Sequence, residues 1–249
     1  MPQHGIGLNY RGPRASWQDR IGTLSPRHMT TAFSMPASGQ SREYLHDGRA
    51  GAIELAVSAP RESARGIAVI CHPHPLFGGA MTNKVVTTLA STAQRHGFVA
   101  VRFNFRCVGK SAGTHDAGRG ETQDCVEVGE WLRAQQPDLP LLLAGFSFGG
   151  FIALKSAASL KPVLLATVAP PFKYFETEPR PLHPNCPWLV LHSTDDDVVS
   201  YEDTRTELMR YQPPPELVTL QGAGHFFHGR LNDLQQSVSD WLTGNGYSA

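Results

Sequence analysis

The stretch that most constrains the fold is Gly145-Phe146-Ser147-Phe148-Gly149-Gly150. Residues 139–144 before it are almost wholly apolar and predict a buried strand, and residues 151–158 after it predict a helix. A strand that turns this sharply into a helix needs glycines beside the turn, and it holds the serine at its tip in a strained backbone with an accessible hydroxyl. The free N–H groups of the new helix point at the same spot and favour negative charge there. The competing interpretation is a glycine-rich turn that lets a helix pack closely on a strand.

The rest of the chain, from about residue 42, alternates between short apolar segments and segments with helical spacing. The expected strands are residues 51–57, 66–71, 98–104, 139–144, 162–168, 188–192 and 217–220. The expected helices are residues 84–96, 121–136, 151–158, 202–211 and 229–242. Such alternation predicts an α/β fold, a three-layer α/β/α sandwich around a mostly parallel twisted sheet of about 7–8 strands. Residues 169–187 carry six prolines and predict a long loop rather than an inserted domain.

Residues 1–40 differ in composition from the rest. They are rich in Gly, Pro, Ser, Arg and Gln and poor in branched apolar residues, so we expect a flexible N-terminal extension before an α/β domain at 41–249. An arm that docks on a second subunit is the alternative. Met29 and Met35 lie inside this segment, which leaves a later start codon open.

Charge and hydropathy exclude several kinds of partner. The 22 acidic and 22 basic residues balance, which gives no electrostatic reason to expect nucleic acid or an anionic membrane as a partner. No apolar run approaches the roughly 20 residues of a membrane span. The first 20 residues have no apolar core and do not resemble a secretory signal. These features predict a cytoplasmic protein.

The four cysteines, Cys71, Cys107, Cys125 and Cys186, are far apart and include no C-x-x-C pair. We therefore expect free thiols rather than a zinc site or a redox pair. His72 and His74 are the other candidates for a metal, but Pro73 and Pro75 break the strand geometry that would align them, and no carboxylate is near in sequence. We expect neither a metal nor another cofactor.

Candidate partners for Ser147 follow two later strands. A serine hydroxyl needs a base within hydrogen-bond reach, and the base needs an orienting acid. Asp195, Asp196 and Asp197 follow the strand at 188–192, and His225 follows the strand at 217–220. Because the carboxyl ends of parallel strands meet at one edge of the sheet, we expect these side chains to meet Ser147 there.

Five stretches together make the chain resemble the α/β-hydrolase superfamily, in particular the small cytosolic serine hydrolases without a cap domain. The order nucleophile, acid, base is the one found in this fold. The stretches that carry the resemblance are Cys71-His72-Pro73-His74-Pro75, Asn104-Phe105-Arg106-Cys107-Val108-Gly109-Lys110-Ser111, Gly145-Phe146-Ser147-Phe148-Gly149-Gly150, His192-Ser193-Thr194-Asp195-Asp196-Asp197-Val198-Val199 and Gly222-Ala223-Gly224-His225.

The resemblance implies a catalytic triad of Ser147, Asp196 and His225. The family motif at the acid reads G-x-x-D-x-V, and with Ser193 at its glycine position the acid is Asp196, with Asp195 as second choice. His225 fits the G-x-G-H turn, whereas His228 is expected at a helix start.

An oxyanion hole is also implied, with one N–H from Phe148 and another from the loop after the strand at 66–71. Proline has no N–H, which leaves His74 or Leu76, and the resemblance points to His74. Pro73 and Cys107 stand where relatives usually carry glycine. Cys107 as a second nucleophile is an alternative to a structural role.

We therefore expect a serine hydrolase that cleaves small carboxylic esters or thioesters through an acyl-serine intermediate. A small-molecule ester is then its partner, and the protein acts as a monomer or homodimer. One alternative is a small-peptide serine peptidase with the same triad, and another is a catalytically silent binding protein of this fold. Seven aromatic residues could line an apolar rim or pack in the core: Phe77, Phe146, Phe148, Phe172, Tyr174, Phe175 and Phe226.

Overall fold

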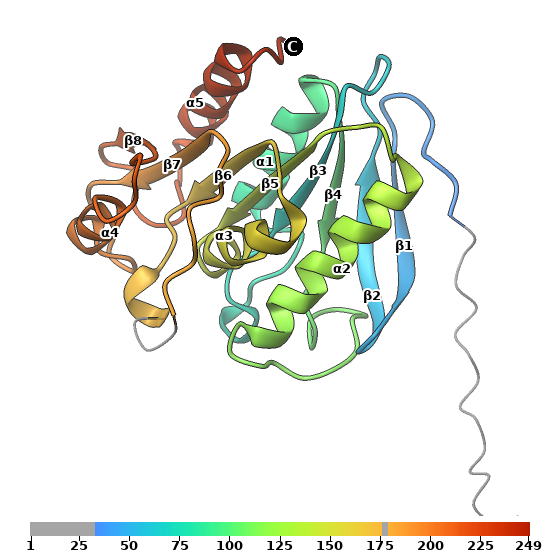
Figure 1. The fold of residues 1–249 in the computed structure, drawn as a ribbon, viewed down its shortest axis with the longest axis horizontal. Coiled ribbons are helices and arrows are strands. Elements are labelled where there is room, and N and C mark those ends of the chain that lie inside the picture. The colour runs from blue at the N-terminus through green and yellow to red at the C-terminus, as the bar shows by residue number, and fades with distance from the viewer. Residues whose placement is uncertain (1–32, 176–178) are drawn as a thin grey trace, which may run out of the picture. The chain divides into compact units, whose positions relative to one another are not determined.

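One eight-stranded sheet forms the centre of the fold (Figure 1). The structure is a computed structural model that describes residues 33–175 and 179–249. The strands lie in the order β1-β2-β4-β3-β5-β6-β7-β8. Both pairings of β2 are antiparallel, and the strands from β4 to β8 run parallel to one another. The strands are β1 (Ser41–Gly48), β2 (Gly51–Ser58), β3 (Gly66–Cys71), β4 (Phe98–Phe103), β5 (Leu141–Phe146), β6 (Leu164–Val168), β7 (Trp188–Ser193) and β8 (Glu216–Leu220).

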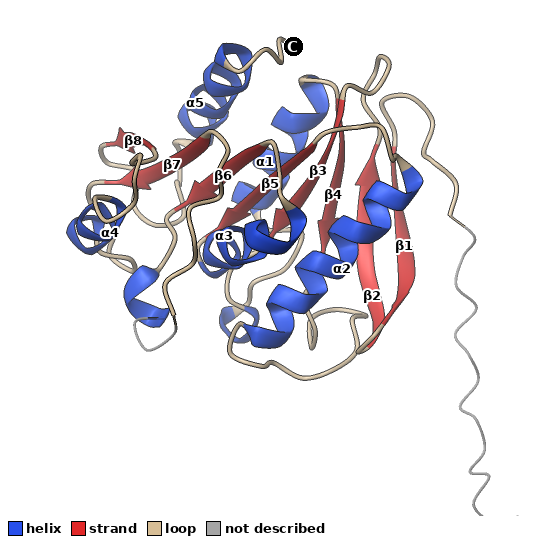
Figure 2. Cartoon of the chain, in the orientation of Figure 1, coloured by secondary structure: helices blue, strands red, loops and turns tan. Residues whose placement is uncertain are grey.

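Helices cover both faces of this sheet. The helices are α1 (Lys84–Arg95), α2 (Arg119–Gln135), α3 (Phe148–Leu160), α4 (Tyr201–Leu208) and α5 (Leu231–Gly244), with short 3₁₀ helices η2 (Pro75–Phe77) and η3 (Phe172–Phe175). On one face α1 packs against α5, and on the other α2 packs against α3. Figure 2 shows α2 and α3 in front of the strands. The predicted three-layer α/β/α sandwich with a mostly parallel sheet is confirmed.

The central strand β3 shows why the sheet is buried on both sides. Ile67, Val69 and Cys71 belong to the apolar core under α2 and α3, whereas Ala68 and Ile70 belong to the core under α1 and α5. Successive side chains of a strand point to opposite faces, so a strand covered on both faces is apolar throughout. The same holds for β5, whose six residues are all buried.

The edge strand β1 is the element that the apolar pattern did not predict. Its sequence, Ser41–Gly48, is mostly polar, and Tyr44 is its only buried residue. It pairs with β2 along its whole length, from Ser41 opposite Ser58 to Gly48 opposite Gly51. Backbone pairing thus holds a strand that buries almost no apolar surface. The other predicted strands and helices agree with the observed ones to within a few residues.

The predicted flexible extension at 1–40 falls mostly on residues 1–32, which lie outside the described residues. The described remainder, residues 33–40, lies against the domain. The Phe33 ring is 5.2 Å from the ring of Tyr44 and 4.9 Å from that of Trp131. Residue 33 is therefore anchored between β1 and α2.

Two further features of the fold concern predictions made from the sequence. In the described part of the chain between β6 and β7, the 3₁₀ turn η3 is the one regular element, as the prediction of a loop in place of a cap requires. Of the described helices, none has the length and apolarity needed to cross a membrane.

Candidate active site

Ser147 lies at the turn between β5 and α3 in a strained conformation. Its φ of 53° and ψ of −125° place a non-glycine residue outside the regions that L-residues favour. Its N–H donates to the carbonyl of Val168 at 2.7 Å, which fixes the turn against β6. A Cβ at Gly145 would overlap the carbonyl of Gly149, and one at Gly149 would overlap the carbonyls of Cys71 and His72. The two glycines are thus explained by the close approach of α3 to β5 and β3.

The three residues predicted as nucleophile, acid and base form one hydrogen-bonded chain. Oγ of Ser147 lies 3.1 Å from Nε2 of His225, and Nδ1 of His225 lies 2.8 Å from Oδ2 of Asp196. The side chains of His225 and Asp196 are 3% and 0% exposed. With the Nδ1–H donated to the carboxylate, Nε2 carries a lone pair that can accept a hydrogen bond from the Ser147 hydroxyl.

Asp196 accepts two more hydrogen bonds at its other oxygen. Oδ1 accepts the N–H of Val198 at 2.9 Å and that of Val199 at 2.7 Å. Burial alone would raise the pKa of the Asp196 carboxyl, but the hydrogen bond from His225 and the two backbone N–H groups outweigh it, so its pKa lies below the usual value. The group therefore stays ionised beside His225.

The second-choice residues have other positions. Asp195 accepts Oγ–H of Ser193 at 2.8 Å and the N–H of Gly222 at 2.7 Å, so it ties the turn after β7 to the loop that carries His225. The Ser193 hydroxyl first, and backbone N–H groups after it, lower the pKa of this carboxyl. His228 is exposed and stacks on Phe226 at 5.9 Å. Sequence reasoning did not predict this link between the two loops through Asp195.

His72 supports the loop that follows β3. It is fully buried; its Nδ1–H donates to the carbonyl of Pro73 at 2.6 Å, and its Nε2 accepts the N–H of Phe105 at 3.0 Å. Burial lowers the pKa of this imidazole to about 4. His72 is therefore a neutral side chain that joins the loops after β3 and β4.

His74 lies in the same loop with both ring nitrogens in contacts. Nδ1 accepts the N–H of Leu76 at 3.2 Å, and Nε2 lies 3.0 Å from the hydroxyl of Tyr174. The N–H of Leu76 is thus already used within the loop, which favours the N–H of His74 over it as the second oxyanion donor. The His74 ring lies 4.9 Å from that of Phe148, the residue that carries the first predicted donor.

The seven aromatic residues predicted as a rim or as core divide between the two. Phe146, Phe148, Phe172 and Phe175 are buried, the usual outcome for phenylalanine. Phe77, Tyr174 and Phe226 are 82%, 54% and 48% exposed and follow β3, β6 and β8. Phe77 ends η2, Tyr174 lies in η3 and Phe226 lies in a turn, and all three segments follow strands at the edge of the sheet that holds Ser147.

Cys107 stands where the resemblance expected glycine, and its backbone has the left-handed φ of 65° that favours glycine. Burial first, and nearby carboxylates after it, raise the pKa of its thiol. A nucleophilic thiol needs the opposite shift, which favours the structural interpretation. Among residues 33–175 and 179–249, no group of three His, Cys, Asp or Glu side chains is arranged to hold a metal ion.

Comparison with known proteins identifies the relatives of this chain. Residues 47–177, just over half of the chain, match the family described as X-Pro dipeptidyl-peptidase (S15 family). The match includes Ser147 and ends before Asp196 and His225. An uncharacterized protein of Rickettsia prowazekii is 29% identical over 209 residues, which cover 79% of this chain and 86% of the relative.

Two solved structures share the fold at higher identity. An α/β serine hydrolase without a lid from Xanthomonas campestris is 37% identical, with a TM-score of 0.77, and covers 84% of this chain and 95% of its own. An α-β serine hydrolase homologue from Coxiella burnetii is 38% identical, with a TM-score of 0.77, over 84% of this chain and 100% of its own.

Proposed function

The chain belongs to the S15 family of the α/β-hydrolase superfamily, and from that premise we propose that it cleaves small carboxylic esters or thioesters through an acyl-serine intermediate. The observation that carries this proposal is the hydrogen-bonded chain from Ser147 through His225 to Asp196, at 3.1 and 2.8 Å. A strained serine beside a buried imidazole and an ionised carboxylate is the arrangement that activates a hydroxyl for attack.

The chemistry begins with the Ser147 hydroxyl. Its oxygen attacks the acyl carbon while Nε2 of His225 takes the proton. The π electrons of the carbonyl group move to its oxygen, which becomes an oxyanion. The imidazolium then gives the proton to the leaving oxygen or sulfur, and an acyl-serine remains. Water then attacks this ester while His225 takes a proton from it, and the return of that proton to Oγ of Ser147 releases the acid and restores the enzyme. Asp196 holds the Nδ1–H tautomer and stabilises the imidazolium throughout.

The oxyanion needs donors that are already in place. We assign the N–H of Phe148, at the start of α3, and the N–H of His74, in the loop after β3. Each such donor contributes about 3 kcal/mol to a tetrahedral intermediate. The Leu76 N–H is held by the His74 ring at 3.2 Å, which supports this choice.

Several features support a small substrate in open surroundings. The described residues between β6 and β7 hold only the turn η3 as regular structure, and the rim side chains Phe77, Tyr174 and Phe226 are exposed. We expect the protein to act in the cytoplasm as a monomer or homodimer. Because its charges balance, we expect neither a nucleic acid nor a membrane as a partner.

A small-peptide peptidase is the second candidate, and the family name favours it. Both reactions use the same triad, so the leaving group decides between them. A catalytically silent binding protein is the third candidate, and the intact Ser147–His225–Asp196 chain argues against it.

The test compares leaving groups on the purified full chain. We expect release of p-nitrophenol from p-nitrophenyl butyrate and its loss in Ser147→Ala, with no comparable release of p-nitroaniline from Gly-Pro-p-nitroanilide. A preference for the dipeptide anilide would replace the esterase by the peptidase. Activity on neither compound, with unchanged circular dichroism, would favour the silent binding protein.

A further inference from the structure

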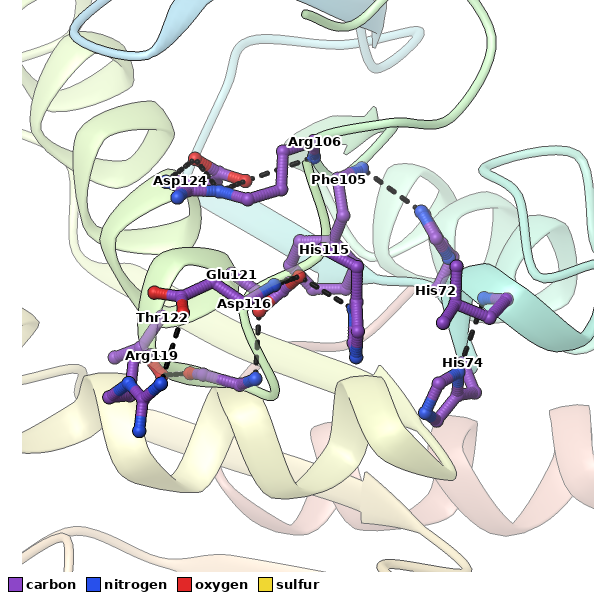
Figure 3. Close-up of polar contacts among 12 residues, drawn as sticks. His72, His74, Phe105, Arg106, His115, Asp116, Arg119, Glu121, Thr122 and Asp124 are labelled. Atoms are coloured by element: carbon purple, nitrogen blue, oxygen red, sulfur yellow. Dashed lines mark hydrogen bonds and ion pairs between the residues drawn. The ribbon is translucent and has the colours of Figure 1, made fainter. Parts of the chain in front are cut away.

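The loop between β3 and α1 carries the N–H of His74, the proposed second oxyanion donor, and the tip of this loop is exposed. Leu76 and Phe77, which follow in η2, are both exposed apolar side chains. His72 anchors the first part of the loop, because its buried ring accepts the N–H of Phe105 at 3.0 Å (Figure 3). The position of His74, further along the loop, depends on other contacts.

The N–H of His74 is available to an oxyanion. Within the described part of the chain this N–H donates no backbone hydrogen bond, whereas the carbonyl of His74 accepts the N–H groups of Phe77 at 3.1 Å and Gly79 at 3.0 Å. The N–H of Phe148, at the first position of α3, has no intrahelical acceptor. A hole made of these two donors stabilises an oxyanion only if the loop holds one at a fixed distance from the other.

The imidazole ring of His74 is held at both nitrogens. Nδ1 accepts the N–H of Leu76 at 3.2 Å, which places the ring proton on Nε2. That Nε2–H donates to the hydroxyl oxygen of Tyr174 at 3.0 Å. The His74 and Tyr174 rings are 5.5 Å apart and nearly perpendicular, at 85°. Tyr174 therefore links the oxyanion loop to the segment that follows β6.

The short element that carries Tyr174 is packed on α3. Phe172 and Phe175, on either side of Tyr174 in η3, are both buried. The Phe175 ring stacks on that of Phe151 in α3 at 3.9 Å and 4°, and the Phe172 ring lies 6.0 Å from the same ring. Two buried anchors thus hold the backbone of η3, while the Tyr174 side chain reaches out to His74.

These contacts connect the two proposed oxyanion donors. The first donor, the N–H of Phe148, begins α3, on which η3 packs. Tyr174 reaches from η3 to the ring of His74, whose own N–H is the second donor. The Phe148 ring also lies 4.9 Å from that of His74 and 5.7 Å from that of Phe175. The bond to Tyr174 therefore fixes the oxyanion loop relative to the start of α3.

We propose that Tyr174 is a positioning residue of the oxyanion hole: its hydroxyl accepts the Nε2–H of His74 and so sets the second donor relative to the N–H of Phe148. The inference rests on the proposed function, which assigns these two donors. Donors that are already in place need no reorganisation when charge develops on the substrate oxygen. Loosening one of them lowers the rate of the chemical step more than it lowers the affinity for substrate.

Two variants remove this contact in different ways. Tyr174→Phe keeps the ring and removes the acceptor. His74→Asn removes Nε2 but keeps an acceptor for the N–H of Leu76, since an Asn side chain bonds the backbone two residues on. Each variant should lower kcat for p-nitrophenyl butyrate by about fivefold, the effect of one hydrogen bond, and change KM by less than about twofold. Because both remove the same contact, the double variant should lose no more than either single variant.

A transition-state analogue reports on the oxyanion hole directly. With 1,1,1-trifluorohexan-2-one, Oγ of Ser147 adds to the ketone carbon, the hydroxyl proton moves to His225, and the π electrons of the carbonyl group move to its oxygen. The inhibition constant of this ketone should rise about fivefold in Tyr174→Phe and in His74→Asn, because the adduct needs the same donors as the transition state.

Tyr247→Phe is the matched control for loss of a tyrosine hydroxyl. The Tyr247 ring lies 4.8 Å from that of Phe98, the first residue of β4. Ser147 follows the last residue of the parallel strand β5, so Tyr247 lies at the opposite edge of the sheet. This variant should change neither kcat nor the inhibition constant.

Three results would overturn the positioning role while Ser147-dependent hydrolysis still stood. The first is a Tyr174→Phe protein with unchanged kcat and inhibition constant. The second is a raised KM with unchanged kcat, which would make Tyr174 a substrate-binding residue. The third is a double variant in which the two losses multiply, since Tyr174 would then act without His74. Hydrolysis of no ester, together with no labelling of Ser147 by a fluorophosphonate, would instead refute the proposed function and the positioning role with it.

Discussion

Substitution of Asp196 by Asn tests whether this carboxylate sets the state of His225. Asn has the same shape, and its carbonyl can still accept the N–H groups of Val198 and Val199, at 2.9 and 2.7 Å. Its NH₂ group then faces Nδ1 of His225 and donates to it. The imidazole proton is forced to Nε2, which can no longer accept the proton of Ser147, 3.1 Å away.

The expected loss follows from the wrong tautomer in a closed site. The side chains of His225 and Asp196 are 3% and 0% exposed, so solvent cannot replace the missing contact. A triad with its histidine in the wrong tautomer loses about 10⁴-fold in kcat, which corresponds to about 5.5 kcal/mol. We expect a loss of that order in Asp196→Asn, with KM for p-nitrophenyl butyrate changed by less than about threefold, since the carboxylate does not touch substrate.

Asp195→Asn is the matched control. Asp195 is exposed, and its bonds to Ser193 and Gly222 can be kept by an amide oxygen. Its kcat should fall by less than about tenfold, because only the position of the loop is affected. Equal losses in the two variants, or an Asp196→Asn protein with more than a tenth of the original kcat, would refute the assignment of the acid.

Two further predictions concern stability. Burial lowers the pKa of His72 from 6.5 to about 4, so between these pH values the unfolded chain binds a proton that the folded chain does not. The contribution of His72 to the free energy of unfolding is therefore fully present above about pH 6.5. It falls as the pH is lowered toward 4, by about 2 kcal/mol at pH 5. Urea unfolding should show this loss, His72→Gln should reduce it, and an unchanged pH slope in that variant would contradict it. Gly149→Ala would press a Cβ into backbone carbonyls and should destabilise the protein by about 1–3 kcal/mol. Gly244→Ala, at an open site in α5, should be neutral or stabilising. Similar changes in the free energy of unfolding for the two variants would refute the packing argument.

The sequence predicted most of the sheet because its strands are buried on both faces. The runs of β3 and β5 have no polar positions that blur the pattern, and in β7 the polar residues, His192 and Ser193, stand only at the carboxyl end. The edge strand β1 has no such signal, since it is held by backbone pairing to β2 rather than by burial. A strand of this kind is visible only once its partner is placed.

The candidate site was predictable where it depends on local turns. The glycines of the elbow and the position of His225 after the last strand follow from backbone geometry. The choice among Asp195, Asp196 and Asp197 came from a motif, and the link from Asp195 to Gly222 depends on the register of β7 and β8.

The contact of His115 with Glu121, 2.8 Å between Nδ1 and Oε1, could not be predicted from spacing. Glu121, three residues after Gly118, supplies one half of a capping box, because its carboxylate accepts the N–H of the N-cap residue Gly118; glycine has no side chain for the other half. That signal says nothing of the His115 ring. The contact of Tyr174 with His74 joins residues 100 positions apart through a proline-rich loop, where the chain has no periodic pattern.

The measurement that tests the central claim most directly is the rate at which a fluorophosphonate probe labels the intact protein, with the labelled peptide mapped by mass spectrometry. We predict a single addition at Ser147, absent in Ser147→Ala and strongly slowed in His225→Ala, because the probe reports an activated serine before any substrate is known. A folded protein that is not labelled, or that is labelled equally fast without His225, would contradict the account.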